Sequence, residues 1–277
     1  MKNSETELVS IGMPVYNGAS YLRKALDSLL VQSYSNWELI ISDNVSTDET
    51  EEICKVYASK DERIRYIRQK VHVDAGDNFY SVAKQARGTY FMWAADDDLW
   101  DPSFLEECVR ALVSLPDAIS VFFRFAFIDE DGGIVKADEA EKFFPFGDTK
   151  EQQLKKYLSL YHHDGKAVLI YGFWVREKLF RFLPYSFRND WVSWGSDANF
   201  IFRILLESRF CFVDKKLFFK RMKTQKRSFG KHFIVKTFYP FILFTTPYFY
   251  RYIIDILTVS NLRISLRLNL IGRVLYS

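Results

Sequence analysis

Three consecutive carboxylates, Asp96, Asp97 and Asp98, directly follow the apolar run from Tyr90 to Ala95. Such a run is suited to a strand buried on both faces, where charge is costly unless it is hydrated, capped or bound to a cation. Mg²⁺ and Mn²⁺ take oxygen ligands and are typically held by one or two carboxylates together with substrate phosphates. On these residues alone, a metal site and a capped, solvated loop are equally open interpretations.

Two further polar segments follow apolar runs earlier in the chain. The segment from Pro14 to Asn17 comes after a predicted strand, and Asp43 and Asn44 come directly after another. Ligands of open parallel sheets bind outside the carboxyl ends of the strands, where loops converge and helix N-termini point toward them. We therefore expect these segments and the carboxylate run to meet at one edge of a sheet.

The elements that position these residues follow from hydrophobic periodicity. From Leu8 to Phe127, short apolar runs alternate with helical patterns. This alternation predicts βαβ units and an α/β fold with a mainly parallel sheet flanked by helices. The strands predicted in this half are residues 8–11, 38–42, 64–67, 90–95 and 119–128.

Polar residues predict where the helices begin. Ser46 with Glu49 predicts a capping box that opens the helix after the second strand. Asp101 and Pro102 stand where an N-cap and a first helical residue are expected. Beyond residue 131 the pattern weakens, and we expect a strand over 168–173, a helix over 196–207 and one or two short strands over 211–219.

Composition limits the classes of protein. A length of 277 residues allows one large domain with an appendage. The total charge of +3 conceals a split, because residues 1–214 carry a net −9 and residues 215–277 a net +12. A basic end indicates an anionic partner, and a solvated basic tail is the alternative. The three cysteines form no CxxC pair, which favours a reducing cytoplasm, and the polar start lacks the layout of a signal peptide.

The last segment, residues 229–277, is aromatic and basic. Between Lys236 and Arg251 lie 14 uncharged residues, fewer than the ~20 apolar residues that span a bilayer. The segment is typical of an amphipathic element that lies in the interface of an anionic membrane. Packing onto the preceding domain, or onto a twin subunit in a homodimer, is the alternative. The interfacial interpretation predicts a cytoplasmic protein, peripheral on the inner face of the cytoplasmic membrane.

Three ordered motifs carry a resemblance to a known family. VSIGMPVYN (residues 9–17), ISDNVSTD (41–48) and GTY (88–90), which leads to the DDD of residues 96–98, resemble glycosyltransferase family 2, the inverting enzymes of GT-A fold. The similarity covers roughly residues 8–228. It implies a GT-A domain over 1–228, with a nucleotide-sugar-binding half (1–128) and an acceptor-side half (129–228), followed by the appendage 229–277.

The resemblance implies roles for residues of the first half. Pro14 and Tyr16 would line the nucleobase pocket, and Asp43 would accept a hydrogen bond from a uracil or thymine ring nitrogen. Asp97 and Asp98 would hold Mn²⁺ or Mg²⁺, although Ala95 replaces an Asp of the commoner pattern. The complete set of expected donor-binding residues is Pro14, Tyr16, Asn17, Asp43, Asn44, Asp96, Arg221 and Lys223.

A second match lies in the acceptor-side half. The sequences YGFW (residues 171–174) and WGSD (194–197) are similar to the segment in which the family places its catalytic base. The resemblance implies that Asp197 is this base; a helix-start carboxylate is the alternative. Trp191 and Trp194 would stack on a sugar or belong to the core. Arg221 and Lys223 would neutralise the leaving group or form a solvated charge run.

The expected activity is transfer of a sugar from a UDP- or dTDP-type donor to a hydroxyl of a saccharide or lipid-linked saccharide, as in cell-surface polysaccharide synthesis. No GxGxxG, Walker, GxSxG or HExxH motif occurs, which excludes several other enzyme classes. No nucleic acid partner is expected. A sugar nucleotidyltransferase and an inactive, membrane-associated nucleotide-sugar-binding scaffold are the alternatives.

Overall fold

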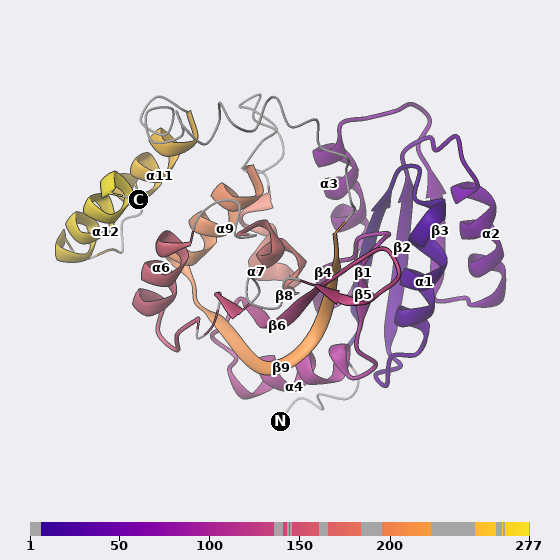
Figure 1. Ribbon diagram of the computed structural model, residues 1–277, viewed down its shortest axis with the longest axis horizontal. Helices are drawn as coiled ribbons and strands as arrows, with labels where there is room; N and C mark the ends of the chain where they lie inside the picture. Colours follow the sequence, from indigo (N-terminus) through magenta and orange to yellow (C-terminus); the bar gives the residue numbers. More distant parts are fainter. Residues whose placement is uncertain are drawn as a thin grey trace.

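One mixed sheet organises the part of the chain that the computed structural model describes. The described residues are 7–135, 141–142, 144, 146–160, 166–183, 196–222, 247–258, 262 and 264–276. Their nine strands are ordered β3-β2-β1-β4-β8-β6-β9-β5, with β7 paired to β6 (Figure 1). The predicted α/β fold with flanking helices is confirmed.

Four parallel strands form the first half of the sheet: β1 (Val9–Val15), β2 (Trp37–Asp43), β3 (Ile64–Arg68) and β4 (Tyr90–Trp93). Their shared direction brings their carboxyl ends to one edge. β1 is longer than predicted and continues through Pro14, which the sequence had suggested as a loop residue. The pairing of β1 with β4 stops at Gly12 and Trp93, so the missing N–H of Pro14 falls beyond this ladder.

Three helices connect these strands: α1 (Ala19–Leu30), α2 (Thr50–Lys60) and α3 (Ala75–Gln85). On α1 the predicted apolar face is buried, with Leu22 and Leu26 fully inaccessible. β2 and β3 lie on one side of β1 and β4 on the other. Right-handed crossovers therefore place α1 and α2 on one face of the sheet and α3 on the opposite face.

The capping box predicted from Ser46 and Glu49 is wrong. α2 begins at Thr50, whose backbone N–H donates to the carboxylate of Asp48. The hydroxyl of Ser46 instead accepts the backbone N–H of Asn17 at 2.9 Å. Ser46 therefore ties two loops together, and Asp48 acts at the start of the helix.

Strands of mixed direction complete the sheet. β8 (Phe173–Val175) lies antiparallel between β4 and β6 (Ser120–Ile128), and the short β7 (Ile134–Val135) pairs with β6. β9 (Phe210–Arg221) runs parallel to β6 and also pairs with β5 (Leu99–Trp100). The strand predicted over 168–173 is wrong, because most of it forms the 3₁₀ helix η3 (Lys166–Tyr171). The predicted 211–219 region is one long strand.

The helix after β5 also begins later than predicted. α4 (Phe104–Ser114) follows Ser103, whose N–H and hydroxyl both donate to the Asp101 carboxylate. Three further helices cover the second half: α6 (Lys150–Ser159), α7 (Arg176–Phe180) and α9 (Ser196–Glu207). The bounds of α9 match the prediction.

Aromatic packing on both faces of β6 accounts for much of the Phe content. Side chains alternate along a strand, so neighbouring Phe residues point to opposite faces. The Phe122 ring lies 5.5 Å from that of Phe146, whereas the Phe123 ring lies 4.8 Å from that of Phe104 on α4. These rings are almost fully buried and form the core of the second half.

Two C-terminal helices, α11 (Pro247–Thr258) and α12 (Ile264–Tyr276), lie at the end of the molecule opposite β3 and α2 (Figure 1). α11 packs on α9, and α12 packs on α6 and α11. The buried Asp255 of α11 pairs with Arg203 of α9 at 3.1 Å. Among the described residues, no helix combines the length and apolar character needed to cross a bilayer.

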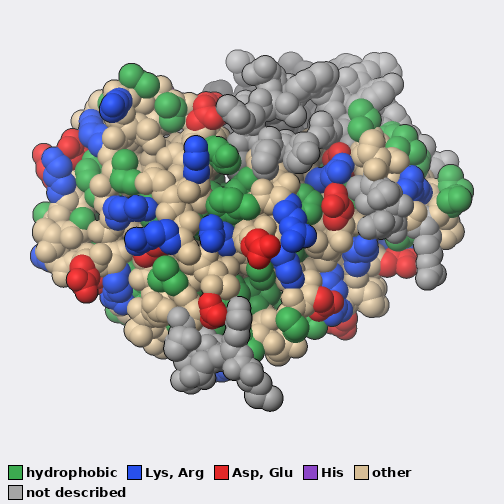
Figure 2. All heavy atoms as spheres, turned by 180° about the vertical axis from the view of Figure 1, so that it is seen from behind, with side chains coloured by type: hydrophobic (Ala, Val, Ile, Leu, Met, Phe, Trp, Pro, Cys, Tyr) green, Lys and Arg blue, Asp and Glu red, His purple; other side chains and the backbone are tan. Residues whose placement is uncertain are grey.

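One face of the molecule carries charges of both signs. Figure 2 shows this face from behind, where Lys and Arg side chains of the described residues are interspersed with Asp and Glu.

A buried carboxylate joins β1, β2 and the segment before β4. Glu38 accepts hydrogen bonds from the Ser10 hydroxyl at 2.6 Å and from the Arg87 guanidinium at 2.7 Å. The N–H of Gly88 donates to the same Ser10 hydroxyl, and a Cβ at Gly88 would overlap the carbonyl of Leu8. Gly88 is therefore required for this close approach of two chain segments.

We predict that Glu38→Gln lowers the free energy of unfolding by about 1–3 kcal/mol at neutral pH. Burial alone would raise the pKa of Glu38, but the hydrogen bonds from Arg87 and Ser10 outweigh it and lower the pKa. A lowered pKa contributes stability above the ordinary value of 4.5 and loses it as pH falls through the folded-state pKa. Urea unfolding from pH 7 to pH 3 should show the difference between variant and wild type shrinking. A constant difference would contradict this account.

Candidate active site at the carboxyl edge of the sheet

Two loops at this edge are tied together through Asn17. Its side-chain oxygen accepts the N–H of Thr47 at 2.8 Å, and its own N–H donates to Ser46. Asn17 has φ of 51° and Val45 has φ of 64°, both in the left-handed region. Asn tolerates this conformation, whereas a β-branched residue does so only under strain, which is typical of functional sites. Asn17 therefore positions the loop after β2. Its contact with the donor stays a prediction.

Asp43, at the end of β2, is fully buried and already bonded on both oxygens. Oδ1 accepts the N–H of Ser46 at 2.8 Å, and Oδ2 accepts the Tyr66 hydroxyl and the Arg68 guanidinium, each at 2.7 Å. Arg68 also pairs with Glu51 at 2.8 Å. The sequence analysis missed Tyr66 and Arg68. The signal was present, because Arg68 ends β3, whose carboxyl end must share this edge.

Tyr16 and Asn44 directly follow Val15 and Asp43, which are paired at the ends of β1 and β2. Tyr16 is half-exposed, and its ring meets the His72 ring edge-on at 4.7 Å. His72 Nδ1–H donates to the backbone carbonyl of Asn44 at 3.0 Å. The Asn44 amide bonds the backbone of Val73 in both directions. Asn44 thus holds the segment that carries His72, while Tyr16 and His72 present an aromatic wall. Pro14, by contrast, is buried within β1.

Asp96 lies against the start of α1. A Cβ at Gly18 would overlap the Asp96 carboxylate, so only glycine leaves room for it there. Burial, followed by the negative charges of Asp43, Asp96 and Asp48, raises the pKa of the Cys54 thiol to about 12. β2 and β4 both run parallel to β1, so the carboxylates that follow them lie at the same edge of the sheet, as the sequence predicted.

Asp98 has a different environment from its two neighbours. It is fully buried, its Oδ2 pairs with Lys220 Nζ at 2.9 Å, and its Oδ1 accepts the backbone N–H of Arg221 at 2.8 Å. Burial would lower the pKa of Lys220, but the Asp98 carboxylate raises it above its usual range. Both Asp98 oxygens hold the end of β9. Asp96 and Asp97 are partly exposed, so the geometry favours these two residues as cation ligands.

Arg221 joins the end of β9 to two loops, the one at Asp97 and the one at residues 129–130. Its side chain is only 4% exposed. The guanidinium donates to the carbonyls of Asp97, Asp129 and Glu130 at 2.8, 2.5 and 2.8 Å. It also lies over the Tyr21 ring at 4.6 Å. These bonds hold the backbone of Asp97 in place. Its Nη2 is buried with no hydrogen-bond partner among the described residues, and its predicted contact with a diphosphate stays a prediction.

Tyr171 connects the candidate base to the carboxylate run. The Lys220 ammonium lies 4.6 Å from the Tyr171 ring centroid. Burial raises the pKa of Tyr171 to about 12; Lys220 opposes this, and the charges of Asp98, Asp97 and Asp197 add to it. Asp197 lies in the first turn of α9, partly exposed, and accepts the N–H of Ala198. Since Tyr171 belongs to η3, and η3 packs on α9, the structure links the helix that carries Asp197 to Lys220 and so to the end of the carboxylate run.

The residues at this edge fit a divalent cation that is bound together with a ligand. No group of three or more His, Cys, Asp or Glu side chains able to hold a metal occurs among the described residues. Asp96 and Asp97 offer hard oxygen atoms, and a site with one or two carboxylates normally draws its remaining ligands from phosphates and water. Three predicted residues, Trp191, Trp194 and Lys223, lie outside the described residues.

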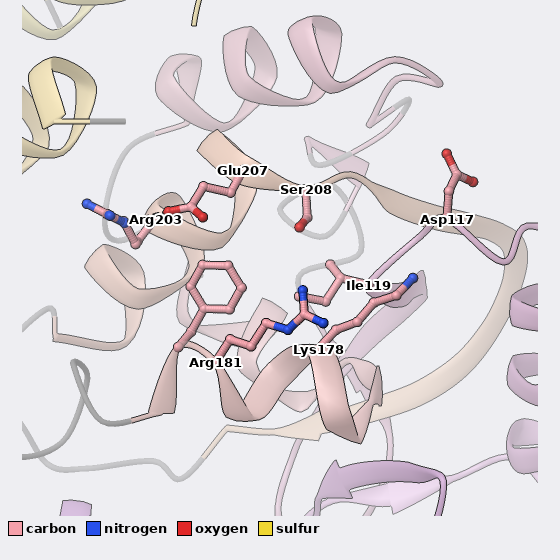
Figure 3. Close-up of a pocket in the computed structure, with 8 residues that line it drawn as sticks. Asp117, Ile119, Lys178, Arg181, Arg203, Glu207 and Ser208 are labelled. Carbon is pink, nitrogen blue, oxygen red and sulfur yellow. Dashed lines mark hydrogen bonds and ion pairs between the residues drawn. The ribbon is translucent and has the colours of Figure 1, made fainter. Parts of the chain in front are cut away.

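A cavity of roughly 440 Å³ lies at the other edge of the sheet (Figure 3). It is bordered by Ile119, just before β6, by Lys178 of α7 and Arg181, which follows that helix, and by Arg203 and Glu207 of α9. β6 reaches the candidate site only at its far end, beside Asp129. This cavity is therefore separate from the strand-tip site.

Comparison with known proteins decides the family. The model of "Glycosyl transferase family 2" matches residues 10–177. The chain belongs to glycosyl transferase family 2. The matched residues include the β1 loop, the end of β2 and the carboxylate run, so the family's motifs coincide with the edge described above.

Relatives within this family carry glycosyltransferase names. An uncharacterized glycosyltransferase of Rickettsia felis is 33% identical over 59% of this chain and 27% of its own length. GlyA of Streptococcus pneumoniae is 26% identical over 78% of this chain and 30% of the relative. An uncharacterized glycosyltransferase of Methanocaldococcus jannaschii is 29% identical over 79% of this chain and 76% of the relative. The chain spans less than half the length of the rickettsial relatives that it matches.

Solved structures confirm the fold. TarS of S. aureus, crystallised with UDP, superposes with a TM-score of 0.70 at 16% identity, over 96% of this chain and 70% of that chain. A mannosyltransferase of Pyrobaculum calidifontis, in complex with GDP-Man and Mn²⁺, has a TM-score of 0.60 at 14% identity. The match covers 98% of this chain and 70% of the mannosyltransferase chain. At these identities the likeness shows the GT-A fold alone.

We predict that Gly18→Ala weakens binding of UDP with Mn²⁺ by at least about tenfold, because the added methyl group displaces the Asp96 carboxylate. Gly272→Ala in α12 is the matched control, since nothing lies within 4 Å of its added Cβ. Calorimetric titration of both variants measures the effect. Equal affinities for Gly18→Ala and Gly272→Ala would contradict the placement of Asp96.

We predict that Asp98→Ala costs about 3–5 kcal/mol of unfolding free energy, because it leaves the Lys220 ammonium without its buried partner. The double variant Asp98→Ala/Lys220→Met should recover part of this loss. Denaturant unfolding of the two single variants and the double variant gives the coupling energy. Strictly additive losses would show that the pair does not hold this edge.

Proposed function

We propose that this chain transfers a sugar from a nucleoside-diphosphate donor, of UDP or dTDP type, to an acceptor hydroxyl with inversion at the anomeric carbon. The observation that supports this most is that Lys220, the partner of Asp98, lies against the Tyr171 ring of η3, and that η3 packs on α9, the helix that carries Asp197. A donor site and a proton acceptor are the two components that such a transfer requires.

The donor half of the proposal rests on the ends of β1 to β4. Tyr16 and His72 offer a ring surface for a nucleobase, beside the polar cluster of Asp43, Tyr66 and Arg68. Both oxygens of Asp43 already accept hydrogen bonds within the protein. We therefore expect Arg68 and backbone groups to contribute, together with Asp43, to the hydrogen bonds with the nucleobase. UDP and GDP-Man in the structures of TarS and of the mannosyltransferase support a nucleotide ligand at this fold.

Asp96 and Asp97 are the proposed ligands of Mn²⁺ or Mg²⁺. The bound cation would neutralise charge on the donor diphosphate and stabilise it as a leaving group. Arg221 holds the Asp97 backbone through its Nε–H, and Gly18 leaves space for the Asp96 carboxylate. Both residues therefore act as positioning residues.

Asp197 is the proposed catalytic base. The acceptor oxygen forms the new bond to the anomeric carbon as its proton passes to the Asp197 carboxylate. The bond from that carbon to the diphosphate oxygen breaks, and its electron pair leaves with the diphosphate. Attack opposite to the leaving group inverts the anomeric centre. We place a saccharide or lipid-linked saccharide, as used for cell-surface polysaccharide, in the acceptor role.

We predict that UDP or dTDP binds more tightly with Mn²⁺ than without it, and that Asp97→Asn removes this enhancement. Asp117→Asn is the matched control, because Asp117 is a carboxylate paired with Arg209 near the cavity at the other edge. Isothermal titration measures both. Absence of binding of either nucleotide would remove the donor assignment.

We predict that Asp197→Asn retains nucleotide binding but lowers the transfer rate by about 100-fold or more, the usual contribution of a general base. Transfer to a panel of saccharide acceptors, with the anomeric configuration of the product read by NMR, tests base and inversion together. Unchanged transfer would reject Asp197 as the base. Binding without transfer in the wild type would favour the inactive scaffold, for which Ala95 is the sequence argument.

A further inference from the structure

The two C-terminal helices have one face that packs on the protein. Tyr252 and Ile256 of α11 are buried, as are Leu270 and Val274 of α12. The Tyr252 ring lies 4.3 Å from that of Phe202 on α9. Packing onto the preceding domain, which the sequence left as an alternative, therefore accounts for one face of each helix.

The other face carries large aliphatic side chains in solvent. Two lie three residues apart on α11 and two lie four residues apart on α12, so each pair shares a helix face. The four side chains and their exposed fractions are Ile254 (45%), Leu257 (54%), Ile264 (77%) and Leu268 (66%). We call these four residues the outer face.

The two pairs lie on adjoining parts of the helices. The guanidinium of Arg267 on α12 donates to the carbonyl of Leu257 at 3.0 Å and to that of Leu262 at 3.1 Å. These bonds join the first part of α12 to the end of α11. Large exposed apolar side chains on two joined helices are candidates for an interaction surface.

Charge indicates which partner covers the outer face. Residues 247–276 contain four arginines, at positions 251, 263, 267 and 273, and one acid, Asp255. Asp255 is buried in its ion pair with Arg203. The segment therefore combines apolar side chains with cations and no exposed acid among the described residues, which matches the headgroups and acyl chains of an anionic bilayer.

We infer that the outer face of α11 and α12 lies in the interface of an anionic lipid bilayer. A second copy of the chain fits less well, because residues 247–276 contain four arginines and one acid, so a two-fold contact would bring together two segments of net positive charge. The inference does not depend on the proposed sugar transfer. Its consequence for that function is geometric: Arg203 and Asp197 are both on α9, so membrane contact would fix the orientation of the helix that carries the proposed base.

Co-sedimentation of the full chain with vesicles tests this inference. We expect binding to phosphatidylcholine vesicles containing phosphatidylglycerol, weaker binding at high salt, and little binding to phosphatidylcholine alone. The double variant Leu257→Gln/Leu268→Gln should lose at least about tenfold in partition coefficient, because two leucines no longer enter the apolar layer. Val113→Gln, an exposed apolar position on α4, is the matched control and should bind like the wild type.

Each outcome bears on the inference. The replaced side chains are exposed, so the melting temperature should stay unchanged and loss of binding will not reflect unfolding. Equal partition of the double variant and wild type, or no binding of the wild type to anionic vesicles, would overturn the inference. A wild-type dimer in analytical ultracentrifugation that dissociates in the double variant would assign the outer face to a second copy instead. Nucleotide titration of the same variants should be unaffected, which separates this test from that of the proposed function.

Discussion

Negative charge gathered at the end of a buried strand is the constraint on which the rest of this structure depends. The run Asp96 to Asp98 follows β4, where water is excluded on both faces, and each carboxylate must be compensated. Asp98 is compensated by Lys220 and by the N–H of Arg221, which draws the end of β9 to the end of β4. Because β9 also pairs with β6 and β5, this buried ion pair joins the two halves of the sheet at one point.

The loops around that point are held by polar bonds rather than by apolar packing. Asn17 joins the β1 loop to the β2 loop, and Asn44 joins the β2 loop to the segment before α3. The backbone of Val45 is left-handed, a conformation that the surrounding bonds must impose. A site assembled in this way is ordered before a ligand arrives, so less conformational entropy is lost on binding.

The sequence predicted most of the first half because period-2 and helical patterns repeat there without interruption. It failed where one side chain had a partner distant in sequence. Ser46 has the sequence of a cap but bonds Asn17. The pairing of Asp98 with Lys220, which is 122 residues away, also has no local signal, and the role of Asp98 as a cation ligand stays a prediction. Arg68 was missed although it directly follows the predicted strand 64–67, because the sequence does not show that this strand lies beside β2 and brings Arg68 to Asp43. Residues 168–173 were apolar enough for a strand, yet tertiary packing makes most of them a 3₁₀ helix.

Family membership and the local chemistry of the side chains both indicate the carboxyl edge of the sheet as the functional site. The family model matches the motifs, whereas the coordinates distinguish one buried carboxylate, paired with Lys220, from two that are partly exposed. The most direct measurement of this division is a crystal structure with UDP and Mn²⁺, using anomalous scattering to locate the metal. The account predicts a manganese peak within bonding distance of Asp97 or Asp96, with the nucleobase near Tyr16. Nucleotide bound elsewhere, or manganese bound away from both carboxylates, would contradict it.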